Sequence, residues 1–153
     1  MIIHRNKTTQ QFNLTHINMK NAIIYGLIIG ILSGAWLFFM RSIGYSGVDD
    51  QATPIEYISI VIPLIGLYFG IRSYRANECG GNMGFLEALI QSFKILLVGG
   101  IISIFSFIVY VNYVAKGNIL RDFSGRMFGA LLVGILFAFG VSLLLNNKSN
   151  KVD

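Results

Sequence analysis

The chain has 153 residues, a length that allows one domain. Apolar residues make up 54% of it and charged residues only 12%, whereas an ordinary soluble domain has about 25% charged residues. This composition excludes a water-soluble fold, because too few polar groups are present to cover its surface. The net charge of +5 comes from dispersed Lys and Arg residues, so it does not indicate nucleic-acid binding.

The chain begins with a polar segment, residues 1–18, that shows no hydrophobic periodicity. Met19-Lys20-Asn21 then leads directly into an apolar run, as short membrane proteins often begin. Two interpretations stay open: a genuine tail, or an extension that is not translated because synthesis starts at Met19. The remaining chain divides into a membrane domain, residues 19–146, and a polar C-terminal tail, residues 147–153.

Four long apolar runs fill most of the membrane domain, and Lys and Arg are almost absent within them. A helix of about 20 residues is about 30 Å long, which matches the hydrocarbon core of a bilayer. The runs are continuous and not alternating, and a helix satisfies its own backbone hydrogen bonds in lipid. We therefore predict an all-α, polytopic membrane protein with four transmembrane helices in a bundle. The predicted spans are Asn21–Met40, Ile55–Ile71, Ile95–Val114 and Met127–Leu145.

The distribution of positive charge predicts the orientation, because cytoplasmic loops are enriched in Lys and Arg. With the N-terminus inside, the inner segments hold eight such residues and the outer loops four. The inner residues are Arg5, Lys7, Lys20, Arg72, Arg75, Lys94, Lys148 and Lys151, and the outer ones are Arg41, Lys116, Arg121 and Arg126. We therefore expect both termini on the cytoplasmic side.

Small residues recur at four-residue spacing in three of the runs, which places them on one face of each helix. Such faces allow helix backbones to approach closely in lipid. The candidate helix-packing residues are Gly26, Gly30, Gly34, Gly66, Gly70, Ala130, Gly134 and Ala138. Packing inside a monomeric bundle, an oligomer interface and the lining of a lumen all remain possible uses. Pro63, inside the second run, removes a backbone donor and is expected to kink its helix.

A glycine-rich turn precedes the third run, and an amphipathic helix is predicted over residues 85–94, continuing into the span. Glu87, Gln91 and Lys94 fall at i, i+4 and i+7 and form one polar stripe. Together with Arg72 and Arg75 they form a candidate cytoplasmic patch at the inner interface. Interfacial anchoring by snorkelling side chains is the simpler explanation of the same residues.

Residues that would carry chemistry are largely missing. His4 and His16 lie in the polar tail, and Cys79 has no Cys or His nearby, so we predict no metal site. No charged residue lies at the centre of a predicted span, which disfavours transport through a buried carboxylate. We expect no catalytic residues and no cofactor.

The residues around the turn resemble those of the four-span DUF4199 family of bacterial membrane proteins. The resemblance rests on Gly70-Ile71-Arg72-Ser73-Tyr74-Arg75, then Gly80-Gly81, Phe85-Leu86-Glu87-Ala88-Leu89 and Lys94, with a family-like start at Met19-Lys20-Asn21. It extends from about Met19 to Leu145. Glu87 stands where Gln is more usual, and Leu89 where Phe is frequent. The resemblance implies a location in the bacterial cytoplasmic membrane and four spans, but no reaction.

Two functions compete at this point. The first is a non-enzymatic scaffold or accessory subunit that acts by helix–helix contacts, with lipid and a second copy or another membrane protein as partners. The second is a small oligomeric transporter or channel. The sparse polar residues in the spans favour the first.

Overall fold

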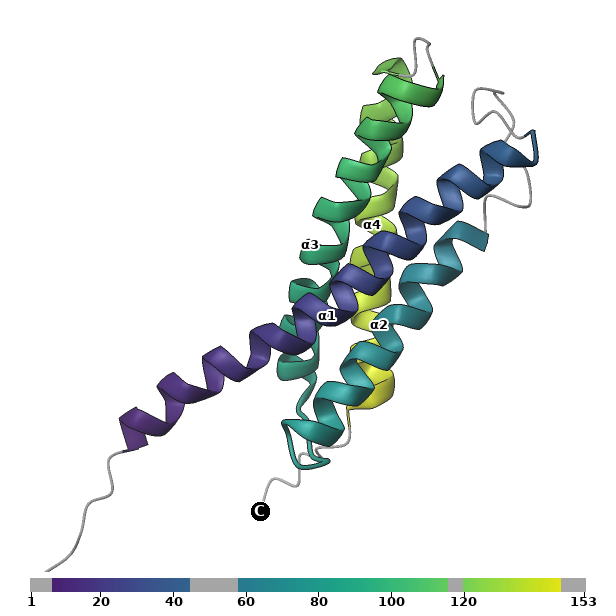
Figure 1. Ribbon diagram of the computed structural model, residues 1–153. Helices are drawn as coiled ribbons and strands as arrows, with labels where there is room; N and C mark the ends of the chain where they lie inside the picture. The colour runs from purple at the N-terminus through teal and green to yellow at the C-terminus, as the bar shows by residue number, and fades with distance from the viewer. Residues whose placement is uncertain (1–6, 45–57, 116–119, 147–153) are drawn as a thin grey trace, which may run out of the picture.

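The computed structural model describes residues 7–44, 58–115 and 120–146 of the chain. This part contains helices and no strand, which confirms the all-α prediction. The elements are α1 (Lys7–Ser42), α2 (Ile58–Asn77), α3 (Phe85–Tyr110), the π-helical segment η2 (Val111–Ala115) and α4 (Leu120–Leu145). Successive helices run in opposite directions, so α1 and α3 point one way and α2 and α4 the other (Figure 1).

The first helix begins earlier than the polar composition of residues 1–18 predicts. α1 starts at Lys7 and continues without a break into the apolar run. Residues 7–18 contain neither proline nor glycine, so a helix formed in the apolar run extends toward the N-terminus with one more hydrogen bond per residue. Residues 1–6 and the whole predicted C-terminal tail, residues 147–153, lie outside the described residues.

Three helices in the described part of the chain are long and apolar enough to cross a membrane: Met19–Ser42, Phe85–Tyr113 and Phe128–Leu145. α2 is not among them, because its described apolar part is only Ile58–Ile71 and two arginines follow in its last turns. A helix of that length covers about 21 Å, less than the hydrocarbon core of about 30 Å. The first residues of the predicted second span, 55–57, lie outside the described residues.

The helices do not contact one another equally. α1 packs against α2 and α3, and α3 also packs against α2 and α4. Between α1 and α4 the described residues make no contact. α3 therefore lies centrally, and the other described helices leave a long side of α4 uncovered.

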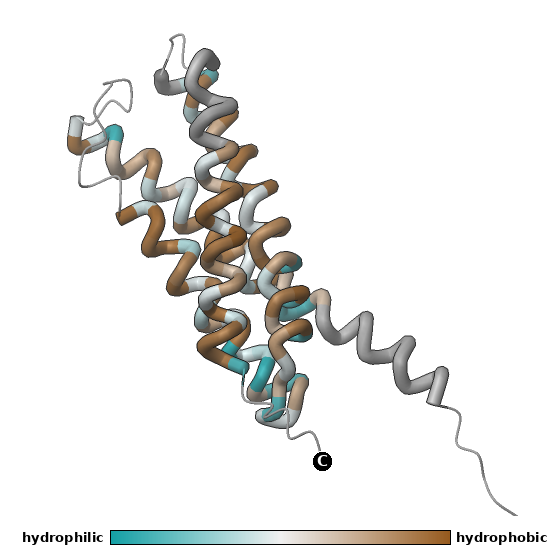
Figure 2. The backbone as a smooth tube through the Cα atoms, turned by 180° about the vertical axis from the view of Figure 1, so that it is seen from behind, coloured by the Kyte–Doolittle hydropathy of each residue, from teal (hydrophilic) through white to brown (hydrophobic). Residues whose placement is uncertain are grey.

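Buried residues gather at one end of the bundle, where α2 and α4 end and α3 begins. The hydrophilic positions of the described helices gather at the same end, near the C-terminus (Figure 2). We call this the polar end. The core cluster there consists of Ala22, Ile29, Leu67, Ile71, Tyr74, Met83, Ala88, Ile95, Val141 and Leu145.

Large apolar side chains cover much of the outer surface of the bundle. Leu97 and Phe105 of α3 are 64% and 67% exposed, and Leu136 of α4 is 68% exposed. Exposed apolar area of this extent requires lipid or another protein as its neighbour. The fold therefore agrees with a membrane protein and not with a soluble bundle.

Candidate functional site: a buried polar layer at one end of the bundle

The polar end contains buried polar side chains that pair with one another between helices. Oδ1 of Asn21 in α1 accepts a hydrogen bond of 3.2 Å from Nε2 of Gln91 in α3. The hydroxyls of Ser92 in α3 and Ser142 in α4 lie 3.3 Å apart, and Ser92 also donates to the carbonyl oxygen of Ala88 at 2.7 Å. Buried polar groups are costly unless they are paired, so these contacts specify how α1, α3 and α4 sit relative to one another.

The second helix joins the polar end through Tyr74 and Arg75. Tyr74 is 7% exposed, and its hydroxyl forms a hydrogen bond with the side chain of Cys79. Nη1 of Arg75 donates to the carbonyl oxygen of Leu145 at 3.2 Å. That carbonyl belongs to the last turn of α4, where backbone acceptors lack partners within the helix. Arg75 therefore ties the end of α2 to the end of α4.

An ionisable group lies directly after α2 in a partly buried position. The Oε2 atom of Glu78 is buried and has no hydrogen-bond partner among the described residues. Burial raises the pKa of the Glu78 carboxyl, and the positive charge of Lys94 opposes this rise. Burial likewise raises the pKa of Tyr74, with smaller contributions from Cys79 and Glu78. The polar end thus holds a carboxyl that protonates more readily than a solvated glutamate.

The turn between α2 and α3 is built on two glycines. Gly80 has φ +58° and Gly81 φ +87°, which is the left-handed region that side chains with a Cβ rarely adopt. Met83 is fully buried and anchors the turn in the core. The N–H of Gly84 donates to the Glu87 carboxylate at 3.0 Å, which satisfies a backbone donor at the start of α3.

The first turns of α3 are amphipathic, but Gln91 of the polar stripe faces inward. Gln91 is 1% exposed, whereas Leu86, Ile90 and Phe93 are among the exposed residues. Gln91, which the sequence assigns to the candidate cytoplasmic patch, is therefore buried inside the bundle instead. The reason is the solvent: in lipid an amide side chain finds its partners only inside the bundle.

The other members of the predicted cytoplasmic patch also occupy different environments. Arg72 and Glu87 are exposed, while Arg75 and Lys94 are half-buried. Arg75 uses its guanidinium within the bundle, and Glu87 caps α3. The structure therefore brings the patch residues to one end of the bundle without arranging them on one surface.

The three glycines of α1 face α3 of the same chain. An added Cβ would lie 2.6 Å from a side-chain atom at each position, closer than real Cβ atoms approach. The neighbours are Val98 for Gly26, Ile102 for Gly30 and Ser106 for Gly34. α3 thus occupies the whole glycine face, which leaves no room there for a second copy.

The glycines of α2 face α1 and α3. A Cβ at Gly66 would overlap Ile29, and one at Gly70 would lie 2.8 Å from Cδ1 of Ile95. α2 continues as one helix through Pro63, so a kink at this proline stays a prediction.

The small residues of α4 differ from these in their surroundings. Ala138 is fully buried, and a Cβ at Gly134 would make ordinary contact with Leu96 at 3.7 Å. Ala130 is exposed, and nothing in the described chain lies within 4 Å of a Cβ at Gly129 or Gly140. The predicted packing residue Ala130 therefore belongs to an uncovered face of α4.

Sequence reasoning singled out Gln91 but missed its partner Asn21, the Ser92–Ser142 pair and Glu78. The overlooked rule is that polar residues near the ends of apolar runs point toward the bundle interior. Applied to Asn21 and Ser142, this rule would have indicated buried positions. It could not have paired them, because pairing depends on how the helices are placed.

In the described part of the chain, no group of three His, Cys, Asp or Glu side chains is placed to hold a metal ion. Among the described residues, the polar end holds hydrogen bonds between helices and the Glu78 carboxyl, whose pKa is raised by burial.

The comparisons with known proteins give one family. The family model described as "Protein of unknown function (DUF4199)" matches residues 24–123, which include α2, the glycine turn and α3. Neither the curated proteins nor the solved structures gave a match. Since the family model covers well over half of the chain, this protein is a member of the DUF4199 family.

Proposed function

We propose that this protein is a non-enzymatic scaffold or accessory subunit of the bacterial cytoplasmic membrane that binds another membrane protein through α4. In this proposal the chain crosses the bilayer four times, with both termini in the cytoplasm. The polar end lies at the inner interface, and the partner binds to an exposed face of α4.

The uncovered face of α4 is the observation that carries this proposal. Gly129, Leu132, Leu136, Gly140 and Leu143 recur at spacings of three or four residues, so they share one side of the helix. All five are exposed in the isolated chain. We call this the α4 face.

The pattern of the α4 face suits a helix better than lipid. At Gly129 and Gly140 there is open space where a side chain would stand, and Leu136 projects between them. In lipid, helices associate through such small residues, which let a partner backbone approach, and through larger side chains that fit against it. The glycines of α1 and α2 meet neighbouring helices in the same way within the chain.

Membrane insertion is supported by the three apolar helices of spanning length. A fourth crossing by α2 is supported by its apolar part Ile58–Ile71 and by the predicted start of this span before residue 58. Arg72 and Arg75 then emerge at the polar end together with Lys20 and Lys94, as the positive-inside rule expects of a cytoplasmic end.

The alternative of a small oligomeric transporter or channel has less support. The described groove between α1 and α2 has apolar walls. A pathway for polar solutes needs polar groups along the membrane depth, whereas the buried polar pairs described above lie at one end.

Site-specific photo-cross-linking tests the proposal. A photoreactive amino acid is placed at Leu136, on the α4 face, and at Leu97 of α3 as a control of similar exposure. In native membranes we expect a discrete protein adduct from position 136 and only lipid adducts from position 97. The combination with Gly140→Leu is expected to abolish the protein adduct, because the new side chain fills the space left for the partner.

The masses of the adducts separate the outcomes. An adduct of twice the chain mass identifies a second copy as the partner, and any other discrete mass identifies a different protein. Lipid adducts alone at both positions, or a protein adduct that survives Gly140→Leu, would refute a partner bound at the α4 face.

A further inference from the structure

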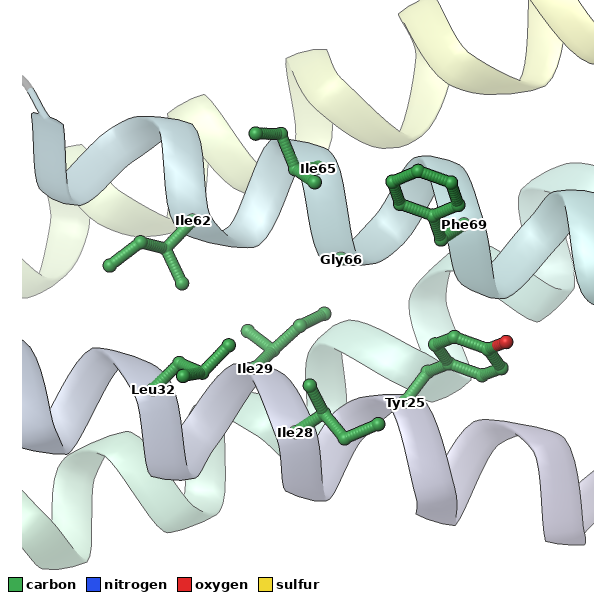
Figure 3. Close-up of a pocket in the computed structure, with 8 residues that line it drawn as sticks. All are labelled: Tyr25, Ile28, Ile29, Leu32, Ile62, Ile65, Gly66 and Phe69. Atoms are coloured by element: carbon green, nitrogen blue, oxygen red, sulfur yellow. The ribbon is translucent and has the colours of Figure 1, made fainter.

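A groove of about 410 Å³ lies between α1 and α2, on a different side of the bundle from the α4 face. Its walls come from Tyr25, Ile29 and Leu32 of α1 and from Ile62, Gly66 and Phe69 of α2. Figure 3 shows the lining side chains in two rows, one along each helix, with the Tyr25 hydroxyl at the end where Phe69 lies. Apart from that hydroxyl, the walls offer only apolar atoms and backbone.

A positive charge stands at the same end of the groove. Arg72 lies three residues after Phe69 and seven after Ile65, which also lines the groove, so it continues this side of α2 toward the polar end. Arg72 is exposed, and no described residue forms an ion pair or hydrogen bond with its guanidinium. One wall of the groove therefore ends at an available cation.

The distance along α2 from the far end of the groove to Arg72 corresponds to the thickness of one leaflet of a bilayer. The ten helical steps from Ile62 to Arg72 span about 15 Å, which is half of the hydrocarbon core of about 30 Å. A helix of a second copy would need a groove along the full core. An acyl chain of one leaflet needs only this half, with its headgroup at the level of Arg72.

We propose that the α1–α2 groove is a specific site for one anionic phospholipid, whose acyl chain lies between α1 and α2 and whose phosphate is bound by Arg72. The Tyr25 hydroxyl is placed to donate to the glycerol or phosphate oxygens at the mouth of the groove. Basic residues beside a gap between membrane helices are a recognised way to select anionic headgroups. This site is independent of the α4 face.

The only tryptophan of the chain is a reporter for the acyl chain. Trp36 lies four residues after Leu32, one turn further along the same side of α1. The purified full chain is placed in phosphatidylcholine vesicles that contain a fixed fraction of phosphatidylglycerol brominated near the ends of its acyl chains. Brominated phosphatidylcholine at the same fraction is the reference. We expect the anionic lipid to occupy the site about fivefold more readily, measured as quenching of Trp36 fluorescence.

Two substitutions of cations at the same end of the bundle separate a site from general surface charge. Arg72→Gln is expected to abolish the preference for the anionic lipid over phosphatidylcholine, to a ratio of about one, because the headgroup loses its counter-charge. Lys20→Gln is the matched control, since Lys20 is exposed but lies away from the groove side of α1, and its preference is expected to stay. Circular dichroism verifies that both variants are folded.

A further variant tests the acyl-chain part of the site. Ile65→Phe enlarges a side chain of the groove wall and is expected to lower quenching by the anionic lipid while Arg72 remains. No preference in the wild-type chain, an equal loss in Arg72→Gln and Lys20→Gln, or an unchanged preference in Arg72→Gln would each overturn the proposal.

Discussion

At the scale of single residues, the glycines fall into two groups, those in close contact with a neighbouring helix and those with open space beside them. Gly26, Gly30 and Gly34 are places where α3 presses against the α1 backbone, whereas nothing lies within 4 Å of a Cβ at Gly100. The same residue type thus serves close packing at some positions and is open to substitution at another.

Gly30→Ala tests this division. The new Cβ would lie 2.6 Å from Cβ of Ile102 and 3.1 Å from the carbonyl oxygen of Gly99, so α1 and α3 must separate. We expect a loss of about 1–3 kcal/mol, as for other overpacked positions, measured by unfolding in mild detergent with increasing sodium dodecyl sulfate. Gly100→Ala is the matched control and is expected to be neutral or stabilising. Equal effects of the two substitutions would show that Gly30 has no packing role.

A second residue-scale prediction concerns the pH dependence of stability. Burial raises the folded-state pKa of Glu78 above its ordinary value of 4.5, so between the two pKa values the folded chain binds more protons than the unfolded chain. Stability therefore falls as pH rises from this ordinary value through the folded pKa. Gln cannot ionise, so Glu78→Gln is expected to melt higher than wild type at about pH 8 and equally at about pH 4.

Thermal unfolding in detergent at both pH values checks this prediction. If the wild-type chain melted higher than Glu78→Gln at about pH 8, the attraction between Glu78 and Lys94 would outweigh the cost of burying the carboxylate.

At the scale of the elements, the helices are joined by polar pairs as well as by small residues. The Asn21–Gln91 hydrogen bond joins α1 to α3, and the Ser92 and Ser142 hydroxyls join α3 to α4. Because these pairs all lie at the polar end, they align the helices there while apolar packing acts along the rest of the bundle.

A double-mutant cycle on Asn21 and Gln91 measures the α1–α3 pair. Gln91→Leu is expected to lower the free energy of unfolding by about 1–2 kcal/mol, because the buried Asn21 amide loses its hydrogen-bond partner in α3. The double variant with Asn21→Leu is expected to lose less than the sum of the single losses, with a coupling of about 0.6 kcal/mol or more. Ile90→Leu, on the exposed side of α3, is the control without effect. Strictly additive losses would rule out a contribution of this hydrogen bond.

At the scale of the whole molecule, the number of crossings decides where the termini lie. Four spans place both termini on one side of the membrane, whereas three spans, with α2 outside the core, place them on opposite sides. Whether α2 crosses the membrane decides the topology, because the described apolar part of α2 is shorter than the spans of the other three helices.

Fusions of green fluorescent protein to each terminus answer it, because this reporter fluoresces in the cytoplasm and stays dark when exported through the general secretion pathway. We expect both fusions to fluoresce, as the Lys and Arg distribution predicts. A fluorescent N-terminal fusion with a dark C-terminal fusion of equal abundance would show three crossings.

The apolar runs and the turn residues carried most of what could be predicted. Runs of about 20 apolar residues specify spanning helices through length alone, and the all-α class and the family followed from local patterns. Gly80 and Gly81 marked the turn before α3, because their backbone conformation is a local property.

Tertiary structure alone decided which side of each helix meets which neighbour. The stripe of Glu87, Gln91 and Lys94 is visible in the sequence, but only the placement of α1 shows that Gln91 points inward to Asn21. Spacing likewise puts Gly30 and Ala130 on helix faces, while the position of α3 covers the first and leaves the second open. Periodicity shows which residues share a helix face. In a membrane, apolar and small residues suit both a face toward lipid and a face toward another helix, so only the contacts between helices show which way each face points.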